Sequence, residues 1–461
     1  MIEASAIKEL RGIVGDRRVL TGPEELLVFS YDGTFCEQRP DVVVVPASTE
    51  EVSRVLKYAD HQRIPVYPRG AGTGLAGGAI PVEGGIALNL ATMNKIREID
   101  LPNMAAVVEP GVITATLQES VDKLGAFYPP DPASLKQCTL GGNVAMNAGG
   151  PRGLKYGVTS NYVLGLEVVI PGGDVLRLGG KPIKNVTGYS LTQLFVGSEG
   201  TLGVVTEVSL RLVPLPKARA VALAVFPRLE DAAAIVQVVL SAGIVPATIE
   251  IMDSSAIACV EAYLHIGLPL DVDALILIEV DGEESLVVRQ LDEVADLCAA
   301  NGASSVQKAT SPPEIDRLWL ARRSVSGSLA RLRPHKLGED ICVPRSSIVP
   351  MVRGIKEIAA RYDLPLAIYG HISDGNLHPN LLFDRRNPEE MERVHRASGE
   401  IFAAAVKYGG TLSGEHGIGL LKKEFLGMAL SPPVIDAMRR VKAAFDPNGI
   451  MNPGKMFPPL T

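Results

Sequence analysis

The alternation of apolar and polar residues predicts a strand–helix–strand unit near the start of the chain. Residues 42–45 form a β-branched run, and Ser48-Thr49-Glu50-Glu51 is a capping box at the start of a helix. Apolar residues then recur at helical spacing, at Val52, Val55, Leu56 and Ala59. A second apolar run, residues 64–67, leads into a glycine-rich segment. The pattern therefore predicts that the glycine-rich segment begins at the end of a strand.

The glycine-rich segment, Pro68 to Pro81, holds five glycines within nine residues: Gly70, Gly72, Gly74, Gly77 and Gly78. Glycine serves where the backbone bends sharply or approaches another group closely, and a row of inward N–H groups suits a phosphate. Residues 72–77 match the G-x-G-x-x-G pattern of NAD sites, but such a site needs a helix to begin there. The next residues would break that helix, so the sequence indicates a nucleotide cofactor and argues against NAD: Gly78, Pro81, Gly84 and Gly85.

Two further glycine clusters, residues 141–150 and 197–203, suggest a long ligand lying along the backbone. Residues 204–212 are expected to form a closing strand, and prolines at 214 and 216 mark a boundary. Beyond it, strand and helix patterns alternate, which predicts an α+β cap over an antiparallel sheet, with elements at 220–226, 229–242, 274–280 and 284–300.

Composition narrows the class of protein. The chain has 461 residues, of which 46% are hydrophobic, so it can form two or three domains with buried cores. Its net charge of -7 and the lack of a long basic run argue against a nucleic-acid partner. No apolar stretch has the length of a signal core or membrane span, so a cytoplasmic location is expected. The cysteines lack any C-x-x-C pair, which argues against a disulfide framework and against an iron–sulfur cluster in this chain: Cys36, Cys138, Cys259, Cys298 and Cys342.

Residues 366–383 predict a β-hairpin around Asp374-Gly375, a strong signal for a two-residue turn. With that turn, His371 would lie directly opposite His378, with Cβ atoms roughly 4.5–5.5 Å apart, a separation suited to metal chelation. Asn380 would share their face of the sheet.

A later segment, SGEHGIG, adds Glu415 and His416 between glycines. Two histidines and one carboxylate are typical of a catalytic rather than a structural metal site. A hydrogen-bonded histidine pair within a sheet is the alternative. Zinc is the expected metal, although these ligand types alone do not separate it from manganese or iron.

A basic stretch, residues 322–336, contains no acidic residue and carries Arg322, Arg323, Arg331, Arg333 and Lys336. Such a run is commonly a solvated helix face. Arginine also offers a planar fork that fits a carboxylate, so the stretch is a candidate anchor for an acidic substrate.

Six motifs, in this order and spacing, resemble the FAD-linked 2-hydroxyacid dehydrogenases of the vanillyl-alcohol-oxidase type. They are PRGAGTGLAGGA, GGNVAMNAGG, KNVTGYSLTQLFVGSEGTLGVVTEVSLRLVPLP, GHISDGNLHPNLLF, SGEHGIG and AFDPNGIMNPGKMF. The resemblance covers residues 39–457 and is strongest to the branch that includes glycolate oxidase flavin subunits and D-lactate dehydrogenases. It implies an α+β fold with a PCMH-type FAD-binding domain of two subdomains at 1–216. A cap carrying the substrate and metal residues would follow at 217–425, and a C-terminal return to the FAD domain at 426–461.

The resemblance also implies which residues bind FAD. The first glycine segment would hold the pyrophosphate, and the other two would line the isoalloxazine and ribityl chain. The first segment contains no histidine for a covalent tether, so the FAD is expected to be non-covalent. The implied set is Pro68, Arg69, Gly70, Ala71, Gly72, Thr73, Gly74, Gly77, Gly78, Pro130, Asp131, Gly141, Gly142, Asn143, Asn147, Gly149, Gly150, Glu199, Gly200, Gly203, Val204 and Asn452.

The expected reaction is oxidation of a small 2-hydroxy acid, glycolate or D-lactate, with hydride transfer to the flavin. Arg322 aligns with the family's carboxylate-binding arginine, and the other implied substrate residues are Ser326, Lys336 and Asn380. Metal on His371, His378 and Glu415 would bind the 2-hydroxyl, and His416 would take its proton as general base.

Several alternatives stay open. A D-2-hydroxyglutarate dehydrogenase or an alkylglycerone-phosphate synthase-like transferase would use the same flavin fold, and an accessory flavoprotein would bind FAD without this metal set. The resemblance implies an iron–sulfur subunit or an electron-transfer flavoprotein as electron acceptor, and such a partner could associate the chain with a membrane. Direct transfer of the electrons to oxygen is the alternative. The exact acid, its enantiomer, the metal and the oligomeric state are not determined by the sequence.

Overall fold

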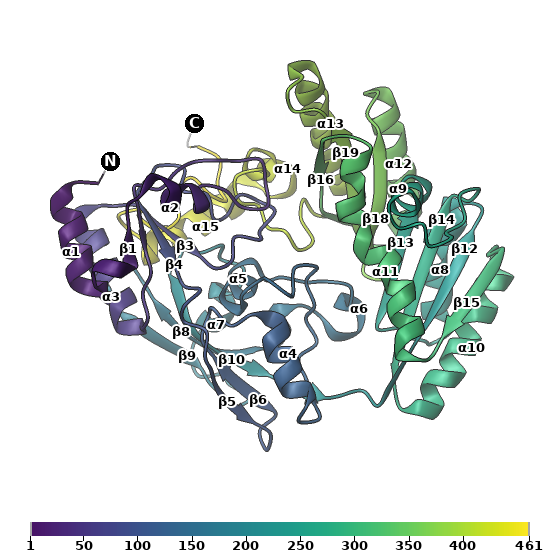
Figure 1. Cartoon of the computed structure of the whole chain (residues 1–461), viewed down its shortest axis with the longest axis horizontal. Helices are drawn as coiled ribbons and strands as arrows, with labels where there is room; N and C mark the ends of the chain where they lie inside the picture. Colours follow the sequence, from purple (N-terminus) through teal and green to yellow (C-terminus); the bar gives the residue numbers. More distant parts are fainter. Residues whose placement is uncertain (1, 460–461) are drawn as a thin grey trace. The chain divides into compact units, whose positions relative to one another are not determined.

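The computed structural model describes residues 2–459 and divides the chain into two compact units. The first unit contains the residues up to Gly149, residues 158–215 and the residues from Glu415 onward. The second contains residues 150–157 and 216–414 (Figure 1). The units thus change at 215/216 and at 414/415, whereas the sequence-based boundaries lie at 216 and 425. No helix within residues 2–459 is long and apolar enough to cross a membrane.

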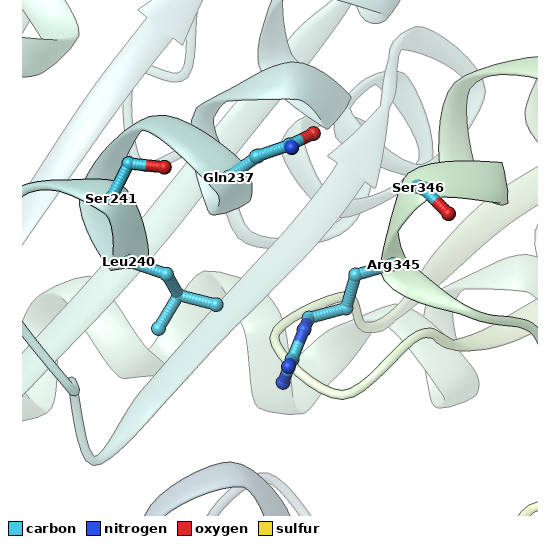
Figure 2. Close-up of a pocket in the computed structure, with 5 residues that line it drawn as sticks. All are labelled: Gln237, Leu240, Ser241, Arg345 and Ser346. Atoms are coloured by element: carbon cyan, nitrogen blue, oxygen red, sulfur yellow. The ribbon is translucent and has the colours of Figure 1, made fainter.

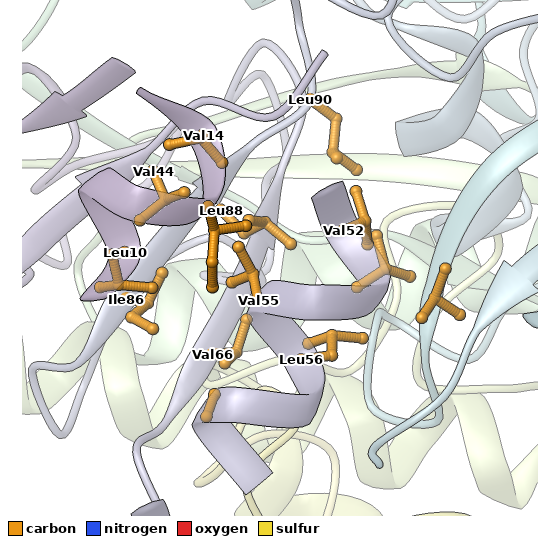
Figure 3. Packing of buried hydrophobic residues seen from close by; sticks show 14 of the residues in the cluster. Leu10, Val14, Val44, Val52, Val55, Leu56, Val66, Ile86, Leu88 and Leu90 are labelled. Atoms are coloured by element: carbon orange, nitrogen blue, oxygen red, sulfur yellow. The ribbon is translucent and has the colours of Figure 1, made fainter. Parts of the chain in front are cut away.

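One sheet of the first unit has the strand order β1-β2-β4-β3 and is parallel except for β1. The strands are β1 (Val19–Leu20), β2 (Val42–Val44), β4 (Ile86–Asn89) and β3 (Val66–Arg69). The predicted helix forms as α3 (Thr49–Gln62), where the Ser48 hydroxyl accepts the backbone N–H of Glu51 at 3.2 Å. The four apolar residues of its predicted stripe are buried in one cluster with residues of the sheet and of α1 (Ala4–Val14). Figure 3 shows three of them, Val52, Val55 and Leu56, in this cluster.

A second sheet of this unit is antiparallel, in the order β5-β6-β10-β8-β9. Its strands are β5 (Ile96–Asp100), β6 (Ala105–Val108), β10 (Val204–Arg211), β8 (Val163–Val169) and β9 (Val175–Gly179), and a small pair joins β7 (Ala126–Phe127) to β11 (Val213–Pro214). In addition to α1 and α3, this unit contains the helices α2 (Pro23–Val28), α4 (Thr114–Asp122), α5 (Leu140–Met146), α7 (Leu191–Phe195), α14 (Leu426–Ala429) and α15 (Pro432–Phe445).

The C-terminal segment returns to the parallel sheet beside β3. The backbone N–H of Val66 donates to the carbonyl of Ile450 at 2.8 Å, and the N–H of Asn452 donates to the carbonyl of Val66 at 2.8 Å. This pairing brings Asn452 next to the start of the first glycine segment, which follows β3.

The second unit is built on one antiparallel sheet, in the order β15-β12-β14-β13-β18-β19-β16, with β17 also paired to β19. Its strands are β12 (Ala218–Phe226), β13 (Thr248–Asp253), β14 (Ala274–Gly282), β15 (Ser305–Ala309), β16 (His335–Gly338), β17 (Ile341–Cys342), β18 (Leu366–His371) and β19 (Asn376–Phe383). Its helices are α6 (Gly153–Tyr156), α8 (Leu229–Ser241), α9 (Ser254–Leu264), α10 (Glu284–Ala300), α11 (Pro312–Ser328), α12 (Ile348–Arg361) and α13 (Pro388–Lys407). The predicted α+β cap over an antiparallel sheet is therefore confirmed.

Helices α9 and α11 pack on one face of this sheet (Figure 1). Their apolar residues share a buried cluster with Met252 of β13, Leu277 of β14 and Leu382 of β19. Because strand residues alternate between faces, polar residues two positions along from these face the same helices. The predicted substrate and metal residues of this unit lie on that face.

Candidate functional site

The first glycine segment leaves β3 and folds back over the side chain of Arg69. Arg69 is buried, and a Cβ on Gly72 (φ 68°) would lie 2.3 Å from its Nη2 atom. A Cβ on Gly70 would lie 2.1 Å from Oγ1 of Thr139, the residue that caps α5. Glycine is required at both positions because a side chain would strike a neighbour or strain the backbone.

The second glycine cluster begins as the helix α5. The Thr139 hydroxyl accepts the N–H of Gly142 at 3.4 Å, which caps the helix, and Asn147 ends it with φ 51°. A Cβ on Gly141 would lie 2.5 Å from Cβ of Pro110, so this turn of helix packs against the chain more closely than a larger residue would allow.

The third cluster and the C-terminal segment meet the first two. The backbone N–H groups of Gly197 and Glu199 donate to carbonyls at the end of α5, at 2.9 and 2.8 Å. The Asn452 amide donates to the carbonyls of Gly78, at 3.0 Å, and of Glu199, at 2.7 Å. One side chain therefore joins the first glycine segment to the third.

The remaining residues of the predicted FAD set lie in the same unit, apart from Gly150, which belongs to the second. Asn143 and Asn147 use their amides inside the unit, bonding to Thr114 at 2.7 Å and to the N–H of Ser160 at 2.8 Å. The carbonyl of Pro130 accepts the amide of Gln118 at 2.9 Å. Asp131 follows Pro130 in the chain, and the others lie in the glycine segments or next to them in sequence: Pro68, Ala71, Thr73, Gly74, Gly77, Gly149, Gly200, Gly203 and Val204.

This arrangement fits a bound dinucleotide. Glycines that tolerate no Cβ are the usual means of letting a backbone approach a phosphate or ring. The Nη1 atom of Arg69 is buried and has no hydrogen-bond partner within residues 2–459, so a ligand oxygen could take that donor. Sequence reasoning missed residues 29–33, which lie over the segment: Phe29 stacks on Arg69, and the N–H of Gly33 donates to the carbonyl of Gly74 at 3.0 Å.

Glu415 and His416 lie in the first unit, against the glycine clusters. A Cβ on Gly149 would lie 2.9 Å from Oε2 of Glu415, and a Cβ on Gly417 (φ 86°) would lie 2.4 Å from the Met146 methyl. Glu415 Oε1 and His416 Nε2 are 3.9 Å apart.

Glu199 fixes the backbone that follows His416. Its buried carboxylate accepts the N–H groups of Ile418 at 2.7 Å and Gly419 at 2.8 Å. Burial raises the pKa of Glu199 above its ordinary value, and these two donors oppose that rise. The segment that carries the predicted general base is thus anchored to the third glycine cluster.

In the second unit the predicted hairpin forms, but its predicted register is wrong by two residues. His371 lies opposite Asn376, and Tyr369 lies opposite His378. The turn covers residues 372–375 because a two-residue type I′ turn needs positive φ at both central residues, and of Asp374 and Gly375 only Gly375 has it, at 88°.

The two histidines nevertheless meet. A shift of two residues keeps each side chain on its face, so His371, His378 and Asn380 still share one face. The imidazole centroids of His371 and His378 are 5.0 Å apart, with the rings at 86°.

Each histidine has a buried carboxylate behind it. His371 Nδ1 is 2.6 Å from Oε1 of Glu250, and His378 Nδ1 is 3.8 Å from Oδ1 of Asp340. Asp340 also accepts the amide of Asn376 at 2.6 Å and the hydroxyl of Ser413 at 2.6 Å. An imidazole hydrogen-bonded to a carboxylate is a usual ligand of a divalent metal, which fits His371, whereas His378 lies near its carboxylate without being within hydrogen-bond distance of it. The two facing imidazoles together offer two nitrogen donors to a metal.

The arginines of the basic stretch differ in exposure, and the Arg322 side chain, at 12%, is far less exposed than those of Arg323 and Arg333. Arg322 Nε lies 2.6 Å from Oε2 of Glu250, and its guanidinium stacks on Tyr369, 4.7 Å from the ring centroid. Arg323 is 58% exposed, and Arg331 and Arg333 contact other parts of the surface. The solvated-face interpretation thus holds for these residues and not for Arg322.

Ser326 and Lys336 are brought together one turn beyond Arg322. Lys336 Nζ donates to the Ser326 hydroxyl at 2.5 Å. Lys336 pairs with Leu382, and Gly338 pairs with Asn380. A Cβ on Gly338 would lie 2.9 Å from Oδ1 of Asn380, so the glycine makes room for this amide.

Sequence reasoning missed Glu250, Asp340 and Asn376. A single glutamate inside the apolar run TIEIM was the available signal, because an unpaired charge is rarely buried in a strand. Burial raises the pKa of Glu250, but Arg322 and His371 outweigh it, so the pKa lies below its ordinary value and the group is ionised.

A cavity of about 420 Å³ opens elsewhere in the second unit, between α8 and residues 345–347 (Figure 2). Its lining consists of Gln237, Leu240, Ser241, Arg345 and Ser346. None of the predicted site residues lines it, so it is not part of the site described here.

Comparison with known proteins identifies the class. Residues 215–456 match the family described as FAD linked oxidases, C-terminal domain, and residues 40–179 match the FAD binding domain. The chain belongs to the FAD-linked oxidase family. The prediction of an FAD-dependent 2-hydroxyacid oxidoreductase is confirmed at the level of the enzyme family, and FAD is its cofactor.

Particular members of this family show how similar the chain is to known enzymes. The chain is 48% identical to the glycolate oxidase subunit GlcD of Bacillus subtilis over 446 residues, 95% of each chain. It is 35% identical to a D-lactate dehydrogenase of Anaerostipes hadrus, covering 96% of this chain and 95% of that one. Substrate-bound p-cresol methylhydroxylase aligns with a TM-score of 0.81 at 21% identity over 98% of this chain and 96% of that one, which supports the predicted fold.

Proposed function

We propose that the chain is a flavin subunit that oxidises glycolate or D-lactate to the 2-oxo acid and passes the electrons to a second protein. The observation that carries the proposal is the sheet face of the second unit, where a little-exposed arginine and two facing histidines lie together. A 2-hydroxy acid presents a carboxylate and a neighbouring hydroxyl, and the two kinds of side chain match those two groups.

Arg322 would hold the substrate carboxylate. Its Nε lies 2.6 Å from Oε2 of Glu250 in an ion pair without hydrogen-bond geometry, and the terminal nitrogens of the guanidinium would make a planar, two-point contact with the substrate. Glu250 keeps the fork from rotating, and the stacking on Tyr369 restricts it further. A small substrate needs no other cation.

A dicarboxylate such as 2-hydroxyglutarate is the second candidate. Lys336, held by Ser326 one helical turn from Arg322, would supply a cation for a second carboxylate. A substrate panel separates the two, because the dicarboxylate should then have the lower KM.

The cofactors would bind as follows. FAD would lie along the glycine clusters without a covalent tether and accept the hydride from the substrate Cα. A divalent metal, zinc by preference, would be held by His371, His378 and Glu415 and lower the pKa of the 2-hydroxyl. Glu415 follows Gly414 directly in the chain, and a Cβ on Gly414 would lie 3.1 Å from Oδ1 of Asp340.

His416 would take the hydroxyl proton. The backbone that follows it is fixed by Glu199. A positioned base of this kind contributes roughly 10²- to 10⁴-fold to the rate.

A separate acceptor protein is proposed because the five cysteines are all free and scattered. An iron–sulfur subunit or an electron-transfer flavoprotein would have the required one-electron chemistry. The test is to reduce the purified protein with its substrate and then admit air. Slow reoxidation supports a protein acceptor, whereas reoxidation as fast as turnover, with stoichiometric peroxide, would make the chain an oxidase.

The substrate is tested with a panel of 2-hydroxy acids, in both enantiomers, and an artificial dye as acceptor. Dye reduction by glycolate or D-lactate, with kcat/KM at least tenfold above that for L-lactate and 2-hydroxyglutarate, is the expected result. Turnover without any acceptor would instead favour a transferase of the alkylglycerone-phosphate synthase type.

A further inference from the structure

Glu250 is a buried carboxylate in the middle of a sheet. It lies on β13 between Ile249 and Ile251 and is 1% exposed. Removing a carboxylate from water is costly unless it is paired and hydrogen-bonded, and an apolar residue would fill this position without that cost. Folding alone therefore does not require an acid here.

The two oxygens of Glu250 serve two different groups. Oε1 is 2.6 Å from Nδ1 of His371, which lies directly opposite on β18. Oε2 is 2.6 Å from Nε of Arg322, which comes from α11. Because the strand backbone fixes the carboxylate, both partners are oriented by the same rigid element.

The orientation has a chemical consequence for each partner. A histidine whose Nδ1–H donates to a carboxylate is fixed in one tautomer, with Nε2 as its metal-binding atom. An arginine paired with a carboxylate at its Nε end keeps its two terminal nitrogens for a second planar acceptor; the Arg322 contact is an ion pair by distance and lacks hydrogen-bond geometry.

We infer that Glu250 is a positioning residue that sets His371 as an Nε2 metal ligand and aims the Arg322 fork at the substrate carboxylate. This inference deepens the proposed function and rests on it. Glu250 would thus orient both groups that bind the substrate: the metal ligand His371, which acts on the 2-hydroxyl, and Arg322, which holds the carboxylate.

The test uses the full chain with FAD and compares Glu250→Gln with Glu279→Gln. Glu279 is a matched control because it is also buried, lies on the neighbouring β14 and accepts a side chain of the same helix, Trp319 Nε1, at 2.7 Å. Within residues 2–459 it forms no hydrogen bond or ion pair with His371 or Arg322, and it lies outside the proposed machinery. FAD absorbance of each variant checks that the first unit is intact.

Zn²⁺ affinity is measured by competition with a chromophoric chelator, and steady-state kinetics are measured with glycolate and D-lactate. Glu250→Gln should bind Zn²⁺ about 10- to 100-fold more weakly and raise KM, while Glu279→Gln should match the wild type in both. Equal Zn²⁺ affinity in Glu250→Gln and the wild type would overturn the inference. A wild type that binds no divalent metal would instead remove the proposed metal site itself, and the inference with it.

If Glu250→Gln fails to fold, the metal-loaded wild type decides the matter. A crystal structure with metal on Nε2 of His371, and with Nδ1 on Glu250, supports the inference. Metal on Nδ1, or a His371 ring turned away from Glu250, would contradict it.

Discussion

Replacing Arg322 by glutamine tests the substrate anchor most directly. The guanidinium is 12% exposed and pairs with a carboxylate that is 1% exposed, so the interaction is little screened by solvent. Truncating one member of a buried charge pair between a protein and its ligand costs roughly 2–5 kcal/mol. At 1.4 kcal/mol per tenfold change, kcat/KM should fall by roughly 30- to 4,000-fold.

The same substitution has a cost in stability that the assay must separate. Breaking a buried ion pair from one side destabilises a protein by roughly 3–5 kcal/mol. The cost here should lie toward or below the lower end, because the hydrogen bond between Glu250 and His371 remains. Thermal unfolding of the FAD-loaded protein measures this part independently.

Dye-linked kinetics with glycolate and D-lactate provide the readout, and Arg323→Gln is the control. Arg323 is the next residue on the same helix, 58% exposed, with its nearest carboxylate oxygen 3.8 Å away. Exposed pairs of this kind are worth about 0–1 kcal/mol, so the control should behave as wild type. A folded, FAD-containing Arg322→Gln variant with kcat/KM within twofold of the wild type would refute the assignment.

Three further predictions follow from the proposed cofactors and base. Acid denaturation should release all the flavin into the supernatant, and yellow colour left on the pellet would show a covalent bond. His371→Ala or His378→Ala should lose the metal but keep FAD, because the hairpin and the glycine clusters lie in different units. His335→Ala is the control: His335 lies on the edge strand β16, near Asp384, and its variant should keep both metal and FAD. Elemental analysis measures the metal in each protein. His416→Ala should keep metal and FAD and slow flavin reduction by roughly 10²- to 10⁴-fold in single-turnover measurements, and a wild-type rate would exclude His416 as the base.

The sequence by itself determined the local elements and the type of site. The stripe of Val52, Val55, Leu56 and Ala59 predicted the buried face of α3, because a helix repeats every 3.6 residues and only one face can be buried. The glycine clusters pointed to a nucleotide because few other uses explain so many residues without a Cβ. The spacing of two residues placed His378 and Asn380 on one face, and His371 shares that face because the observed register differs from the predicted one by an even number of residues.

The tertiary structure decided the register and the partners. The two-residue turn expected at Asp374-Gly375 did not form, since Asp374 lacks the positive φ that it requires, and Asn376 took the position opposite His371. The charge pattern alone did not separate Arg322 from its basic neighbours, although the family resemblance did, because its low exposure depends on strands far away in the chain. Glu250 is 72 residues from Arg322 and 121 from His371, so only the packing of β13 against β18 and α11 could bring the three side chains together.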